Sequence, residues 1–307
     1  MSTALDVSLF PECFTSFPVR LHKDERLLAA RCNTLVEEFS HLLPDYQPPS
    51  LSAGPHGVVY ALCFPEGEIR RLMLCAEFTE SAWFYDEAVL LHAAVKQMFV
   101  QGSQRANGPD LDVAPKKWLS LISIFQHTAA RMIDVDPKGA PWLLERHVQY
   151  WSEYDSTKGS YDRIEDYIRY RNLNIGYWTM SNSMQWCLDI YLSDEEMRLS
   201  QDFDTSSTRV LTLTNDYWSW SREKGQVSDR ALNGIPVVMK QYSMSEADAK
   251  IFVKGMIVEA EQRTRALGLE LKKHSDVLRR YVEGIFLILG GNALWSSTCP
   301  RYNEVAE

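Results

Sequence analysis

Three polar side chains in the second half of the chain are spaced so that they could bind a metal ion. Asn215, Ser219 and Glu223 follow one another at intervals of four residues in the segment LTLTNDYWSWSREKG. In an α-helix a step of four residues turns the chain by about 400°, so the three side chains share one face. They offer an amide oxygen, a hydroxyl oxygen and a carboxylate, which are hard ligands suited to magnesium. The spacing therefore indicates a magnesium site with open positions for the phosphate oxygens of a substrate.

The same spacing also fits an ordinary solvated helix face, and the neighbouring residues bear on that choice. Tyr217, Trp218 and Trp220 predict that this helix is largely buried. Polar groups on a buried helix need partners, because removing an unpaired polar group from water is costly. A metal ion is one suitable partner, and spacing alone leaves the two interpretations open.

Helical patterns dominate the rest of the chain. Apolar residues recur at helical spacing, and residues 57–64 form the one serious candidate strand. The expected helices are 24–43, 79–100, 116–134, 142–154, 161–174, 176–191, 194–202, 207–223, 245–267 and 269–295, with Asp194 and Ser245 as N-caps. Loops are expected at 47–57, 101–115, 136–141 and 225–236. Helices packed on helices in a single domain, residues 1–307, predict an all-α fold.

Composition and charge exclude several classes of protein. The net charge of −9 at pH 7 argues against nucleic-acid binding, which requires an excess of positive charge. Six cysteines lie far apart without metal-ligand spacing, so we expect buried, reduced thiols in a cytoplasmic protein. The first residues lack the pattern of a signal peptide, and the longest apolar stretch is too short to cross a bilayer. We therefore expect a soluble protein.

The segment with the three polar residues, NDYWSWSRE, resembles the second metal-binding motif of class I terpene synthases, with every key position filled. The C-terminal segment LWSSTCPRYN resembles the end of the cyclase domain in fungal chimeric di- and sesterterpene synthases of the fusicoccadiene and ophiobolin synthase type. The resemblance extends over nearly the whole chain. It implies a helical bundle around a central apolar pocket. It also implies an enzyme that ionises an isoprenoid diphosphate and cyclises the resulting carbocation.

Further segments match the family's diphosphate-binding residues. In EDYIRYRNLNIG, residues 165–176, Arg171 takes the place of the arginine that senses diphosphate, with Arg169 as the alternative. Arginine suits this role because its planar fork pairs with two phosphate oxygens. Residues 174–176 take the place of the helix break whose carbonyls help to stabilise the first cation. The resemblance assigns the remaining diphosphate contacts to Arg301, Tyr302 and Lys224.

The family's aspartate-rich motif is incomplete. WFYDEAVLLH, residues 83–92, has Asp86 and Glu87 at the first two acidic positions, but Leu90 where the last acid belongs. By the resemblance, Asp86 and Glu87 would join the three polar residues in holding a cluster of about three magnesium ions with the diphosphate. The Leu90 departure leaves open a catalytically degenerate protein that binds isoprenoids.

The resemblance also implies a dry pocket in which aromatic rings stabilise migrating positive charge. Six aromatic residues near the motifs are candidates for its lining, although such residues also simply fill cores. They are Trp83, Phe84, Trp178, Trp186, Trp218 and Trp295. The resemblance favours geranylgeranyl diphosphate as the substrate, with geranylfarnesyl diphosphate next. A prenyltransferase would supply the substrate. It would be either a further domain, which would make this chain an excised cyclase domain, or a separate enzyme.

The sequence leaves two further functions to weigh against a cyclase and a degenerate isoprenoid-binding protein. A prenyl chain-elongating enzyme would need two facing aspartate-rich motifs, whereas this chain has the Asn-Ser-Glu set in the second place. A helical interaction scaffold predicts that replacing Asn215 or Glu223 changes stability and no activity. The product, its stereochemistry and a homo-oligomeric state are left open by the sequence.

Overall fold

The computed structural model describes residues 2–42, 52–87, 116–153, 159–224 and 232–303, and almost all of them are helical or connect helices. The helices of the first half are α1 (Glu25–Leu42), α2 (Val59–Cys63), α3 (Ile69–Glu87), α5 (Lys116–Val135) and α6 (Gly139–Glu153). Those of the second half are α7 (Ile164–Arg171), α8 (Tyr177–Leu188), α9 (Asp194–Glu223), α10 (Gly234–Tyr242), α11 (Glu246–Leu271), α12 (Asp276–Thr298) and α13 (Pro300–Asn303). The expected all-α fold is confirmed.

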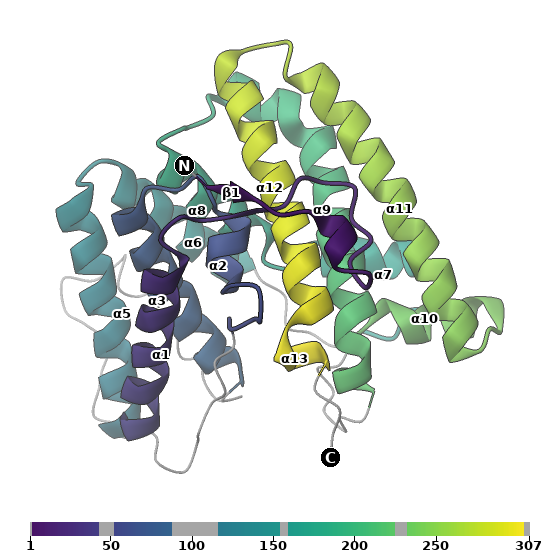
Figure 1. Cartoon of the computed structure of the whole chain (residues 1–307), viewed down its shortest axis with the longest axis horizontal. Coiled ribbons are helices and arrows are strands. Elements are labelled where there is room, and N and C mark those ends of the chain that lie inside the picture. Colours follow the sequence, from purple (N-terminus) through teal and green to yellow (C-terminus); the bar gives the residue numbers. More distant parts are fainter. Residues whose placement is uncertain (1, 43–51, 88–115, 154–158, 225–231, 304–307) are drawn as a thin grey trace.

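Helix α12 lies in the middle of the bundle (Figure 1). It packs on α2 and α8 on one side and on α9 and α11 on the other, and α11 runs along α9. Most of α12 is buried, because its surface is apolar along nearly its whole length. The short helix α13 follows it and contacts α9. This arrangement brings the C-terminal end of the described chain beside the helix that carries the Asn-Ser-Glu set.

The N-terminal segment crosses α12 and is held on both sides of it (Figure 1). Strand β1 (Thr3–Ala4) pairs antiparallel with β2 (Arg20–Leu21), and a 3-10 helix (Val7–Leu9) lies between them. Glu261 of α11 is buried and accepts hydrogen bonds from the Thr15 hydroxyl at 2.7 Å and from the Ser16 backbone N–H at 2.7 Å. The segment therefore ties α11 to the first half of the bundle.

Residues 57–64 are not a strand. Val59–Cys63 form the helix α2, which is buried throughout and packs against α12. A short, fully buried apolar run lacks an exposed face, so its periodicity does not distinguish strand from helix. Among the described residues, β1 and β2 are the strands, and each is two residues long.

The sequence also misplaced several helix ends. The expected break at 203–206 is absent, because the buried Asp204 accepts hydrogen bonds from the Tyr177 and Tyr281 hydroxyls at 2.6 and 2.7 Å, and α9 continues through it. Ser193, not Asp194, caps α9 in a capping box, whereas the predicted cap at Ser245 is confirmed. Helix α11 runs on to 271 and α12 starts at 276, later than predicted. Helix α10 lies partly where a loop was expected, and α3 begins at 69 rather than 79.

The expectation of buried thiols is confirmed. All six cysteines lie in the described part of the chain, and all are buried free thiols. No helix in the described ranges has the length and apolar character needed to cross a membrane.

Candidate active site

Helix α9 presents the Asn-Ser-Glu set at its C-terminal end. Asn215, Ser219 and Glu223 lie in the last three turns, and Glu223 is the final helical residue. Ser219 is buried, whereas Asn215 and Glu223 are partly exposed. The helix packs against α10, α11, α12 and α13, which hold it in place in the bundle. The common face expected from the spacing is therefore present in the fold.

Arg171, the candidate diphosphate-sensing arginine, reaches this face from the end of α7. Its Nη2 donates a hydrogen bond to Oδ1 of Asn215 at 3.1 Å, and its Nη1 donates to Oδ1 of Asn174 at 2.8 Å. Its Nε lies 3.7 Å from Oδ1 of Asp216. The predicted helix break is present, since α7 ends at Arg171 and α8 begins after Gly176, which has a φ of 85°. Arg169 points elsewhere, being largely exposed and paired with Asp166.

Tyr302 of α13, a distant part of the chain, reaches the same asparagine. The Nδ2 of Asn215 donates a hydrogen bond to the Tyr302 hydroxyl at 3.0 Å. The amide of Asn215 thus bonds Arg171 through its oxygen and Tyr302 through its nitrogen. The Arg301 guanidinium carbon lies 6.0 Å from the Tyr302 ring centroid. Tertiary structure therefore brings together three of the residues selected from the sequence, Arg171, Asn215 and Tyr302.

Asp216 holds the neighbouring elements together beneath this face. It is fully buried, and its Oδ2 accepts hydrogen bonds from the Tyr167 hydroxyl at 2.7 Å and from the Gly234 backbone N–H at 2.9 Å. Burial raises the pKa of this carboxyl to about 7, although Arg171 and Tyr167 act in the opposite direction. Sequence reasoning assigned Asp216 no role; in the structure it connects α7 and α10 to α9.

Asn233 is a second residue that the sequence did not single out. It is buried, and it lies just before α10 with its Nδ2 directed at the Asn-Ser-Glu set. That nitrogen donates to Oε2 of Glu223 at 2.9 Å and lies 3.4 Å from Oγ of Ser219. An asparagine ten residues beyond the motif, before an apolar run, reads from sequence only as a helix cap, so no local pattern could have revealed these contacts.

Four aromatic rings form a continuous row from α2 through the acidic helix α3 and α12 to Tyr302 of α13. Trp295 of α12 lies 5.5 Å from Tyr302 and 6.2 Å from Trp83 between ring centroids, and Trp83 lies 6.1 Å from Tyr60 of α2. The Trp295 indole is fixed by a hydrogen bond from Nε1 to the backbone oxygen of Ser52 at 2.9 Å. We call Tyr60, Trp83, Trp295 and Tyr302 the aromatic wall. Trp83 lies three residues before Asp86, so the wall spans from the acidic motif to the Asn-Ser-Glu set.

The other aromatic candidates lie elsewhere. Trp186 is fully buried and donates a hydrogen bond from Nε1 to Oδ2 of Asp136 at 2.9 Å, a contact between α8 and the turn that joins α5 to α6. Trp218 packs against Phe14 of the N-terminal segment, with centroids 6.1 Å apart. Trp178 is 42% exposed at the start of α8. The side chain of Phe84 is outside the described part of the chain.

Two groups of candidates are not joined to this cluster by any described contact. Asp86 and Glu87 occupy the last turn of α3, but their side chains and all of Leu90 lie outside the described residues. The ammonium group of Lys224 is half exposed and pairs with Oε1 of Glu246 at 3.0 Å. The expectation that it contacts diphosphate remains a prediction.

The donor set of α9 fits a hard divalent cation. Oδ1 of Asn215, Oγ of Ser219 and the carboxylate of Glu223 are all oxygen donors on one helix face, which suits magnesium rather than a softer metal. Within the described ranges, no three His, Cys, Asp or Glu side chains are grouped so that they could hold a metal ion. A mixed set of amide, hydroxyl and carboxylate oxygens is thus the best candidate metal centre that those ranges provide.

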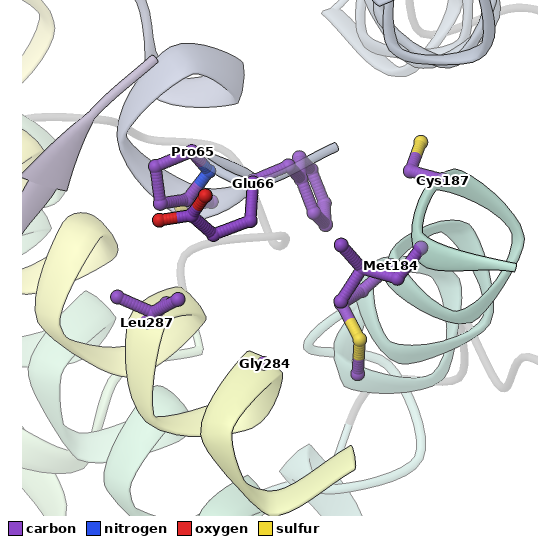
Figure 2. Close-up of a pocket in the computed structure, with 9 residues that line it drawn as sticks. Pro65, Glu66, Met184, Cys187, Gly284 and Leu287 are labelled. Carbon is purple, nitrogen blue, oxygen red and sulfur yellow. The ribbon is translucent and has the colours of Figure 1, made fainter. Parts of the chain in front are cut away.

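A small pocket between α2, α8 and α12 is a different feature (Figure 2). Figure 2 shows Met184 and Cys187 of α8 facing Leu287 and Gly284 of α12, with Pro65 and Glu66 at one edge. Its lining is mostly apolar, and it contains none of the residues that carry the cluster around Asn215. It is a packing gap of the bundle rather than a reaction site.

Comparison with known proteins defines the class to which this site belongs. Residues 85–263 match the family described as terpene synthase family 2, C-terminal metal binding. The match covers more than half of the chain and includes the last turns of α9, and the chain belongs to this family. Because metal binding is part of the family description, a divalent metal is supported as the cofactor.

Fungal terpene synthases are among the relatives. The chain is 27% identical over 313 residues to a bifunctional terpene synthase of Fusarium proliferatum, and this alignment covers 95% of this chain and 41% of that protein. It is 25% identical to a sesterterpene synthase of Colletotrichum orbiculare, covering 97% of this chain and 44% of that protein. It is 26% identical to preterpestacin I synthase of Cochliobolus heterostrophus, covering 97% and 45%. The chain thus spans less than half the length of these relatives.

Solved structures confirm the class I terpene synthase fold. Aristolochene synthase from Penicillium roqueforti superposes with a TM-score of 0.70 at 16% identity, over 93% of this chain and 98% of that one. The 2-methylisoborneol synthase of Streptomyces coelicolor, solved with Mg2+ and geranyl-S-thiolodiphosphate, superposes with a TM-score of 0.71 at 16% identity, over 91% and 92%. At such low identity the likeness concerns the fold alone.

Proposed function

We propose that this chain is a magnesium-dependent terpene cyclase, which ionises a linear isoprenoid diphosphate and closes the carbocation into a cyclic terpene. The observation that carries the proposal is the Asn215 amide, which bonds Arg171 on one side and Tyr302 on the other. These two residues lie far apart in the chain, at positions 171 and 302, and both can donate hydrogen bonds to phosphate oxygens. Membership in a terpene synthase family supports the same conclusion.

The chain's own residues have separate parts in the proposed reaction. Asn215, Ser219 and Glu223 on α9, with Asp86 and Glu87 on α3, would together hold about three magnesium ions. These ions would stabilise negative charge on the diphosphate as the C–O bond breaks. Arg171 would pair with two diphosphate oxygens, because its guanidinium group presents two parallel N–H donors. Arg301, Tyr302 and Lys224 would bind further oxygens. These residues orient the leaving group before the bond breaks.

The aromatic wall would then face the cation. Aromatic faces attract positive charge without attacking it, and they keep water from the reactive carbon. Trp83 of α3 contacts Trp295, and Trp295 contacts Tyr302, which supports a position for both tryptophans beside the expected diphosphate. The other candidates, Phe84, Trp178, Trp186 and Trp218, have no described contact with this wall and are weaker proposals.

For the substrate we propose geranylgeranyl diphosphate first and geranylfarnesyl diphosphate second. The second is supported by the sesterterpene synthases among the relatives, because sesterterpenes derive from the longer precursor. A prenyltransferase would supply either substrate, and the word bifunctional in the name of the Fusarium proliferatum relative supports a coupled activity. We further propose that residues 1–307 form one cyclase domain and that the six thiols reflect a reducing, cytoplasmic location.

The test is incubation of purified protein with magnesium and, in turn, farnesyl, geranylgeranyl and geranylfarnesyl diphosphate, followed by gas chromatography–mass spectrometry. We expect a cyclic hydrocarbon from one substrate. It should disappear in Asn215→Ala and without magnesium, but persist in Asn33→Ala, an exposed asparagine of α1. A folded protein that binds the diphosphates yet forms no product would instead support the degenerate isoprenoid-binding protein that Leu90 suggests.

A further inference from the structure

Asn233 is held in one orientation by its own backbone neighbourhood. Its Oδ1 accepts a hydrogen bond from the Ile235 backbone N–H at 2.8 Å and so caps the N-terminus of α10. An amide oxygen must occupy that position, because a backbone N–H can only donate. The Nδ2 of the same amide therefore points the other way, toward α9.

That nitrogen contacts two members of the Asn-Ser-Glu set and the backbone between them. Nδ2 donates to Oε2 of Glu223 at 2.9 Å and to the backbone oxygen of Asp216 at 2.9 Å, and it lies 3.4 Å from Oγ of Ser219. An amide nitrogen has two hydrogens, so it can satisfy the two shorter contacts fully and the longer one in part. Asn233 is buried, which shields these bonds from competing water.

The chemistry of these contacts suits the positioning of metal ligands. Glu223 ends α9, where the helix dipole disfavours a negative charge and the side chain would otherwise sample several rotamers. A donor on Oε2 fixes the carboxylate and leaves Oε1 free to bind a cation. The amide nitrogen has no lone pair available for a metal, so it orients the ligands without competing with them.

We propose that Asn233 is a positioning residue that orients Glu223, and in part Ser219, for magnesium binding, an inference that rests on the proposed function. In other metal sites, removing a group that hydrogen-bonds to a metal ligand commonly weakens metal affinity by about 10- to 100-fold. The loss of Asn233 should therefore weaken magnesium binding while Asn215 and Arg171 keep their own contact.

The test replaces the donor and keeps the cap. Asn233→Ser retains an oxygen that can cap α10, but its side chain is too short to reach Glu223. We would measure Mn2+ binding by electron paramagnetic resonance in the presence of inorganic diphosphate, and separately the magnesium concentration for half-maximal cyclisation. The dissociation constant for Mn2+ and the magnesium concentration for half-maximal cyclisation should each rise about tenfold. Saturating magnesium should restore the turnover number. Ser275→Ala, which removes the cap of α12, is the matched control and should leave the Mn2+ affinity unchanged.

Each result separates this inference from the proposed function. Wild-type affinity in a folded Asn233→Ser protein would overturn the positioning role alone. A wild-type protein that binds no Mn2+ with diphosphate would overturn the proposed function and this inference together. If Asn233→Ser does not fold, Asn233→Thr also provides a capping hydroxyl and fills more of the volume, and the same loss of affinity is expected. In Glu223→Gln the added Asn233→Ser change should have little further effect, because the two residues act through one contact.

Discussion

Arg171 and Asn215 are 44 residues apart in the chain, yet Nη2 of the arginine lies 3.1 Å from Oδ1 of the asparagine. That oxygen is also the atom proposed to bind magnesium. A carbonyl oxygen has two lone pairs, so the arginine and the metal can share it, or the arginine can leave it for a diphosphate oxygen. Either way, this contact couples the diphosphate-sensing residue to the metal site.

We predict that Arg171→Lys weakens inorganic diphosphate binding and lowers kcat/KM by about 100-fold, because lysine cannot pair with two oxygens in parallel. Calorimetric titration with magnesium and diphosphate measures the first effect, and product formation measures the second. Arg169→Lys is the control, since Arg169 lies two residues earlier on α7 and is exposed. Equal losses in both variants would show that Arg171 has no special role.

Tyr302→Phe should lower kcat/KM by about tenfold and leave the melting temperature nearly unchanged. The change removes the hydroxyl that accepts the Asn215 bond, worth about 1 kcal/mol, and keeps the ring contact with Trp295. Steady-state kinetics and thermal unfolding check the two parts. Tyr242→Phe, at an exposed ring of α10, should leave both values at the wild-type level. A fully active Tyr302→Phe protein would remove this hydroxyl from the mechanism.

His147 should make folding stability depend on pH. Burial lowers the pKa of this side chain from 6.5 to about 3, so between these values the unfolded chain binds a proton that the folded chain does not. Stability therefore falls as the pH falls through 6.5, by about 2 kcal/mol between pH 7 and pH 5 from this group. Urea unfolding at the two pH values should show a loss smaller by that amount in His147→Leu. An equal loss in both proteins would refute the prediction.

Two glycine substitutions should have opposite effects. A Cβ atom on Gly291 of α12 would collide with the backbone carbonyl group of Leu62 and would lie 2.8 Å from the Cys63 backbone nitrogen. Gly291→Ala should therefore reduce the free energy of unfolding by about 3 kcal/mol, since neither helix can move away without opening the core. Gly255, exposed in α11, has no atom within 4 Å of such a Cβ. Gly255→Ala should increase stability by about 0.5–1 kcal/mol. Urea unfolding of both variants checks the signs.

Local helical geometry made much of the fold and part of the site predictable. The common face of Asn215, Ser219 and Glu223 depends only on residues within eight positions of one another, and a helix places them there whatever surrounds it. The Ser245 cap and the break before Gly176 are equally local. Patterns failed where burial overrode them. Val59–Cys63 is helical, and Asp204 lies inside a helix because two distant tyrosine hydroxyls and the hydroxyl of Ser200 one turn earlier satisfy its carboxylate.

The sequence by itself determined the helical class, the Asn-Ser-Glu face, the candidates Arg171 and Tyr302, and the family resemblance. Only the tertiary structure decided that Asn215 bonds both of those candidates, that Trp83 and Trp295 form a wall beside Tyr302, and that Asn233 reaches Glu223. Neighbours along a helix follow from a repeat of about 3.6 residues. Contacts between helices depend instead on how whole apolar surfaces pack, and no short segment of the chain contains that information.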